Sequence, residues 1–234
     1  MFDLEKFTVK KPKPLPVLLL LDVSGSMAGE KINNLNNAVS EMINSFKNEK
    51  VDVEIQVAVI TFGSECKISQ KYMNASDIRW QNLQAGGNTP LGECLKLAKE
   101  IIEDKETTPS RAYRPAVILV SDGYPTDIWQ EPMMSFISNG RSSKCDRMAM
   151  AIGNDADKEM LSLFLKGTKN HLFEAKDAAD IFKFFKYVTM SVTMRSKSVN
   201  PNEIIDASFE EVESTPALDN KKSSSNDENN TGWF

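Results

Sequence analysis

The chain has little of what zinc sites and disulfide frameworks need. It contains one histidine, His171, and three cysteines among its 234 residues. The cysteines, Cys66, Cys94 and Cys145, lie far apart, form no CxxC pair and are odd in number. These counts argue against a zinc site and against a disulfide framework. They indicate reduced thiols and a cytoplasmic location.

The sequence also lacks a basic segment of the kind that binds nucleic acid. Its net charge is −5. Residues 201–234 hold eight acidic and two basic side chains, a balance of −6, which leaves +1 for residues 1–200. A nearly neutral domain without a basic stripe does not match a nucleic-acid surface, so we expect no nucleic-acid partner.

Long apolar runs are missing as well. The apolar run 15–21 follows Lys10, Lys11 and Lys13, as the core of a signal peptide would, but it ends on Asp22 without a small-residue cleavage site. The run is also far too short to cross a bilayer. We therefore interpret it as a buried strand and predict no membrane association.

Alternating apolar patterns predict one α/β domain. The runs 16–21 and 116–120 are continuously apolar, which is typical of parallel strands covered on both faces. We expect strands at 16–21, 51–62, 116–120, 147–152 and 171–174, and helices at 30–48, from 89 onward, at 130–138, 156–166 and 177–193. This order predicts a single doubly wound, mostly parallel sheet with one antiparallel edge strand and helices on both faces.

The segment 63–90 contains the predicted edge strand of that sheet and the start of the next helix. The turn Gly63-Ser64 allows only an antiparallel hairpin, which makes 66–68 a short edge strand. Residues 71–88 look irregular. Thr89 is expected at the N-cap of the next helix, with Pro90 at its first position.

The chain divides into three parts on composition. Residues 1–13 form an N-terminal extension, 14–195 the domain and 196–234 an acidic tail that is expected to be largely disordered. The tail ends on Trp233-Phe234. These aromatics are either incidental terminal residues or a docking peptide on a flexible tether.

Oxygen-bearing side chains gather where two buried strands end. Asp22, Ser24 and Ser26 follow the strand 16–21, Asp122 follows the strand 116–120, and Thr89 opens a helix. Ligands of open α/β sheets bind at the carboxyl ends of the strands. Five oxygen ligands, two of them charged and none of them imidazole or thiolate, suit Mg²⁺ or Mn²⁺. The sequence therefore predicts a single divalent-cation site.

Three segments carry a family resemblance. DVSGS (22–26), GNTP (87–90) and SDG (121–123) resemble the metal-ion-dependent adhesion site (MIDAS) of von Willebrand factor A domains, over roughly residues 14–195. The resemblance implies that Ser24, Ser26 and Thr89 coordinate the cation directly. Asp22 and Asp122 then act mostly through waters or hydrogen bonds, and a Glu or Asp carboxylate of a protein partner completes the coordination shell.

The same resemblance suggests a setting and a motion. TPLG after the glycine-rich loop and SDGYPTD after the second strand are similar to the stand-alone von Willebrand factor A proteins of bacterial tellurium-resistance (Ter) clusters. That similarity implies an intracellular stress-response assembly. The family also implies that the last helix, 177–193, slides when the metal site changes its coordination. Trp129, close to the Asp122 loop, is a better candidate for facing a partner than Trp80.

Enzymatic alternatives fit the residues less well. A haloacid-dehalogenase-like phosphatase would need a second Asp as general acid at the position of Ser24. A Rossmann nucleotide site would need GxGxxG after the first strand, where Gly25 stands alone. We predict a Mg²⁺-dependent protein-binding module and no enzyme. A metal-dependent phosphoester hydrolase is the alternative, and a structural domain with a vestigial site is a third possibility.

Overall fold

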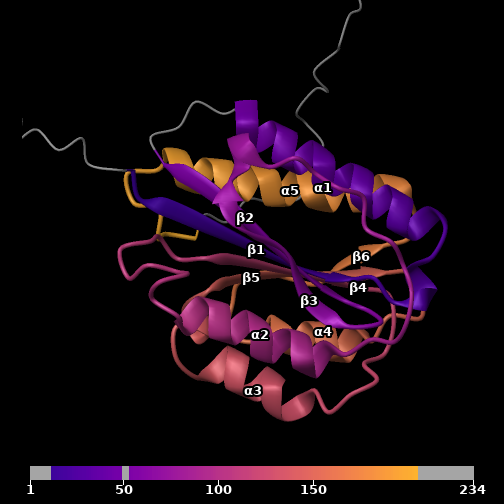
Figure 1. Ribbon diagram of the computed structural model, residues 1–234. Coiled ribbons are helices and arrows are strands. Elements are labelled where there is room, and N and C mark those ends of the chain that lie inside the picture. Colours follow the sequence, from indigo (N-terminus) through magenta and orange to yellow (C-terminus); the bar gives the residue numbers. More distant parts are fainter. Residues whose placement is uncertain (1–11, 49–52, 205–234) are drawn as a thin grey trace, which may run out of the picture.

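A six-stranded sheet between two helical layers forms the body of the molecule (Figure 1). The computed structural model describes residues 12–48 and 53–204. The strand order is β3-β2-β1-β4-β5-β6, and only the β2–β3 pair is antiparallel among the described strands. The strands are β1 Pro14–Asp22, β2 Glu54–Phe62, β3 Cys66–Asn74, β4 Ala116–Ser121, β5 Asp146–Ile152 and β6 Phe173–Ala175. The helices are α1 Glu30–Asn48, α2 Leu91–Glu103, α3 Gln130–Ser138, α4 Lys158–Phe164 and α5 Ala178–Lys197.

The two faces of the sheet are covered by different helices. Helices α1 and α5 lie on one face, and α2, α3 and α4 lie on the other (Figure 1). Along β1, Val17 and Leu19 belong to the core on the α1 side, whereas Leu18 and Leu20 belong to the core on the α2 side. A strand that is buried on both faces needs a continuous apolar run, and the predicted fold is confirmed.

The position of β1 in the sheet creates the place for a site. It pairs in parallel with both β2 and β4, with Leu21 opposite Val120. The chain winds outward in both directions from this pair, so the loops after β1 and β4 leave toward opposite faces. Such a switch point leaves a crevice beyond the carboxyl ends of the two strands.

The edge strand is longer than the sequence indicated. We expected irregular structure from residue 71, but β3 continues to Asn74. Its side chains are mostly exposed or half buried, because an edge strand contributes little to the core. Without an apolar run, its length could not be recognised from hydropathy alone.

Helix α2 is capped from a distant loop and not by Thr89. It begins at Leu91, and neither Thr89 nor Pro90 caps it with a side chain. The carboxylate of Asp127 instead accepts hydrogen bonds from the amides of Gly92 (3.0 Å) and Glu93 (2.9 Å). The expected N-cap at Thr89 is therefore wrong.

The predicted division of the chain reaches beyond the described residues at both ends. The predicted extension, the tail and its terminal Trp233-Phe234 lie wholly or largely outside the described residues. The division at 14–195 therefore stays a prediction. Within residues 12–48 and 53–204, no helix is long and apolar enough to cross a membrane.

Candidate metal site at the carboxyl ends of β1 and β4

Asp22 ends β1 and is fully buried. Its Oδ1 accepts a hydrogen bond from the Ser24 amide (2.8 Å), and its Oδ2 accepts one from the Ser121 hydroxyl (2.6 Å). Burial raises the pKa of Asp22, and the hydrogen bonds from Ser121 and Ser24 oppose that rise. The carboxylate is thus fixed in orientation in a place where a nearby cation would stabilise its charge.

A chain of oxygens leads from this carboxylate to the second one. The hydroxyls of Ser24 and Ser26 lie 3.0 Å apart, and the Ser26 hydroxyl donates to Asp122 Oδ1 at 2.6 Å. Ser24 and Asp122 are buried, whereas Ser26 is exposed. The structure thereby brings four of the five predicted ligands into one hydrogen-bonded group.

Thr89, the fifth predicted ligand, lies in a loop that is hydrogen-bonded to both strand ends. The loop contacts the β1 end where the Gly25 amide donates to the Gly87 carbonyl (3.0 Å). It contacts the β4 side through Thr126, whose amide donates to the Thr89 carbonyl (3.0 Å) and whose hydroxyl accepts from the Thr89 amide (3.0 Å). Thr89 is buried at the meeting point of these loops.

Gly87 makes the close approach of this loop possible. Its φ is +81°, a conformation that L side chains rarely adopt. A Cβ at this position would lie 2.3 Å from the backbone of Ser64. The glycine in GNTP is therefore required by the packing of the loop against the β2–β3 turn.

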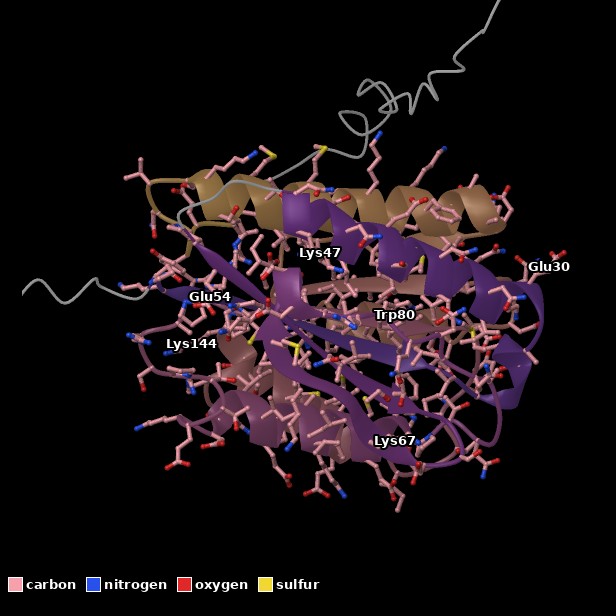
Figure 2. The ribbon with its side chains drawn as sticks, turned by 45° about the horizontal axis from the view of Figure 1, so that its top comes forward. Glu30, Lys47, Glu54, Lys67, Trp80 and Lys144 are labelled. Carbon is pink, nitrogen blue, oxygen red and sulfur yellow. The ribbon has the colours of Figure 1, made fainter. Side chains whose placement is uncertain are left out.

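Lys31 also contacts the site, although we did not predict this from the sequence. Its Nζ donates to Asp122 Oδ2 at 2.6 Å. The residue lies in the first turn of α1, soon after the DVSGS turn. This position was the available sequence signal, because α1 begins close to the carboxyl end of β1. Figure 2 labels the neighbouring Glu30 at this end of the molecule.

The ligand set is hydroxyl-rich and low in charge. In the described part of the chain, no three His, Cys, Asp or Glu side chains are close enough together to hold a metal ion. The candidate site does not conflict with this observation, because three of its five predicted ligands are Ser or Thr. The convergent oxygens fit a hard cation such as Mg²⁺ and fit zinc less well.

The surface around the site carries exposed apolar side chains. In the loop after β4, Tyr124 is 68% exposed and Ile128 is 79% exposed. Trp129, the better of the two tryptophan candidates for facing a partner, is half buried against the core on the α2 side. Their place after Asp122 was the only sequence signal for Tyr124 and Ile128.

A groove of about 790 Å³ lies beside the site, between β3 and residues 79–86. Its walls include Val23 and Gly86 from the site's loops and the half-buried Trp80. Figure 2 labels Trp80 below α1 and Lys67 near the start of β3. The five predicted ligands lie next to this groove and not in its walls.

Comparison with known proteins identifies a matching family model and several solved structures with a similar fold. The family model of the von Willebrand factor type A domain matches residues 17–186. Among curated proteins, none matches the chain.

Three solved structures illustrate the fold similarity. A von Willebrand factor type A protein from Catenulispora acidiphila is 21% identical, with a TM-score of 0.60 over 78% of this chain and 43% of that one. The pilus adhesin SpaC from Lactobacillus rhamnosus GG is 15% identical, with a TM-score of 0.65 over 79% and 30%. Proximal thread matrix protein 1 of the mussel byssus, with a zinc-occupied MIDAS motif, is 16% identical, with a TM-score of 0.58 over 76% and 48%. This chain spans less than half the length of each.

Proposed function

Since the chain belongs to the von Willebrand factor type A domain family, we propose that it is a divalent-cation-dependent module that binds another protein. The observation that carries the proposal is the oxygen network at the β1 and β4 ends, which joins Ser24, Ser26 and Asp122. Ser24, Ser26 and Thr89 would hold Mg²⁺ or Mn²⁺ directly. Asp22 and Asp122 would act through waters and hydrogen bonds, as their engaged oxygens suggest.

The partner would supply the missing anionic ligand. Hydroxyl ligands leave a bound cation with most of its charge unneutralised, so an acidic side chain of a second protein would complete its shell. Tyr124 and Ile128 are exposed beside the site and would contact apolar groups next to that acid. The expected partner therefore offers a Glu or Asp within an apolar surface.

Two features of the site argue against phosphoester hydrolysis. Both Asp22 oxygens already accept hydrogen bonds, and Ser24 occupies the place where a general acid would be needed. We propose that the protein is not an enzyme and that it works in the cytoplasm, in a stress-response assembly like those of the Ter clusters.

Metal titration tests this function directly. Isothermal calorimetry should show one Mn²⁺ or Mg²⁺ site per chain, lost in Asp122→Ala. Asp155→Ala is the matched control, because it removes an exposed acid from the loop after the next strand, β5, and should bind normally.

Two further measurements separate the proposed function from its rivals. Capture of partners should disappear with a chelator and in Asp122→Ala, and Tyr124→Ser should weaken capture while leaving metal affinity unchanged. A generic phosphoester should not turn over with Mg²⁺ or Mn²⁺. Turnover that Thr89→Ala abolishes would support the hydrolase instead. Normal Mn²⁺ binding by Asp122→Ala would contradict the site.

A further inference from the structure

The ion pair between Lys31 and Asp122 engages one of the predicted ligands of the proposed metal site. The ammonium lies 2.6 Å from Asp122 Oδ2, while Oδ1 accepts the hydroxyl of Ser26. The Asp122 side chain is completely buried, whereas the Lys31 side chain is 36% exposed. Asp122 therefore accepts from one neutral donor, Ser26, and from one charged donor whose partly exposed side chain can turn toward solvent.

The charges of the site show why this lysine matters. Asp22 and Asp122 place two carboxylates in one buried network, and like charges in such a place repel each other. Lys31 changes the summed formal charge of the three side chains from −2 to −1. A divalent cation bound near Asp122 would repel the ammonium, so the two positive charges compete for the same carboxylate.

We propose that Lys31 is a tethered cation that neutralises Asp122 when no metal is bound and thereby weakens metal binding. The idea rests on the proposed function, because it assumes that the site takes a divalent cation. Lys31 stabilises the metal-free domain and must give up part of its contact with Asp122 when the metal enters. Metal affinity and metal-free stability are then set in opposite directions by one side chain.

The lysine on the same helix provides a matched control. Lys47 is exposed in the last turn of α1. Lys47 follows Lys31 by 16 positions, which corresponds to about 24 Å along the helix and exceeds the screening length of about 10 Å at 0.1 M salt. Figure 2 labels Glu30 and Lys47 at opposite ends of α1. Lys47→Met removes the same charge from the same helix without touching the site.

The test combines Mn²⁺ calorimetry with thermal unfolding in chelator. Lys31→Met should bind Mn²⁺ about ten-fold more tightly, the equivalent of one lost charge-assisted hydrogen bond. The same variant should unfold at a lower temperature without metal. Lys31→Arg, which keeps the charge, should resemble the wild type in both measurements, and so should Lys47→Met.

The outcomes separate this inference from the proposed function. If Lys31→Met binds Mn²⁺ no more tightly than the wild type, the tethered-cation role is overturned while the metal site stands. If Lys31→Met binds Mn²⁺ and the wild type does not, the tethered-cation role is supported in its strongest form. If neither protein binds Mn²⁺, the proposed function and this inference both fail. Should Lys31→Met not fold, Lys31→Gln decides in its place, since its amide can still donate to Asp122 without a charge.

Discussion

Two buried acids at opposite ends of the sheet differ in how completely they are neutralised. Asp122 follows β4 at the carboxyl end, and Asp146 begins β5 at the amino end. The partner of Asp122 is a lysine that is 36% exposed. The partner of Asp146 is Arg195, and both of those side chains are completely buried, with Nη1 3.3 Å from Oδ2. Figure 2 labels Glu54 and Lys144 at this second end.

The network around Asp146 is closed. Its other oxygen accepts from the amide group of Asn170 at 2.9 Å. Arg195 also donates from Nε to the Pro201 carbonyl (3.0 Å) and from Nη2 to the Arg114 carbonyl. Burial lowers the pKa of Arg195, and Asp146 opposes that effect. Here every charge has a fixed partner, whereas the β4 end combines two carboxylates with one movable cation. We conclude that the open network fits a ligand and the closed one fits a structural role.

The largest effect is expected from breaking the closed network. Arg195→Met leaves the Asp146 carboxylate buried without its cation and should lower the free energy of unfolding by about 3–5 kcal/mol. Urea unfolding followed by circular dichroism measures this loss. Adding Asp146→Leu to the same variant should recover part of it, because the buried charge is then gone. A loss below about 1 kcal/mol in the single variant would show that the network is not structural.

Removing a charge from the open network should weaken metal binding without lowering the stability of the metal-free protein. Asp22→Asn should weaken Mn²⁺ binding roughly 10–100-fold, as expected for a residue that positions metal ligands. Its metal-free stability at pH 7 should not fall. A carboxyl whose pKa is raised by folding prefers its neutral form, so its ionised form costs stability at any pH above both pKa values. Calorimetry and thermal unfolding in chelator check both statements. A clear loss of metal-free stability would mean that Asp22 is structural as well.

The distant cap of α2 should contribute an intermediate amount. Asp127→Ala removes the acceptor of the Gly92 and Glu93 amides and should cost about 0.5–2 kcal/mol. Because α2 begins two residues after Thr89, we also expect weaker Mn²⁺ binding. Chemical denaturation and calorimetry measure the two effects. The control is Asp155→Ala, which removes an exposed acid from the loop after β5. Equal stability of the two variants would contradict the cap.

The smallest expected effect is a difference in cysteine reactivity between the two ends of the sheet. The hydrogen bond with Cys94 lowers the pKa of the half-exposed Cys66, at the end where the site lies. Burial raises the pKa of Cys145, next to Asp146, to about 12. Brief iodoacetamide treatment followed by mass spectrometry should therefore label Cys66 first. Cys94→Ala should move the pH midpoint of Cys66 labelling upward. Labelling of Cys145 at the same rate would contradict the structure.

The sequence predicted the features that depend on local patterns. The continuous apolar run of β1 indicated a strand buried on both faces, and Asp22, Ser24 and Ser26 follow it within one turn. Asp157, an acid just before a predicted helix, accepts the Met160 amide as the N-cap of α4. Each of these inferences needed only neighbouring residues.

What could not be predicted depends on contacts between distant segments. Lys31 and Asp122 are 91 residues apart, and Asp127 caps a helix 35 residues earlier in the chain. The local sequence Thr89-Pro90 is a good cap signal, but tertiary structure replaced it with a stronger acceptor. The pair Arg195 and Asp146, 49 residues apart, follows the same rule, because charge pairing across the fold leaves no periodic signal.

The anchoring of Arg195 sets how α5 could respond to the site. The contacts with Asp146, Pro201 and Arg114 hold the last turns of the helix at the amino end of the sheet. Its first turn follows the carboxyl end of β6, on the same side as the site, and is capped by Asp177, which accepts the Asp180 amide. The first half of α5 packs into the core through Ile181, Phe184 and Phe185, and its first residue lies about 25 Å along the helix from Arg195. We therefore expect α5 to tilt instead of sliding as the family resemblance implies, with the greatest displacement at its first turn.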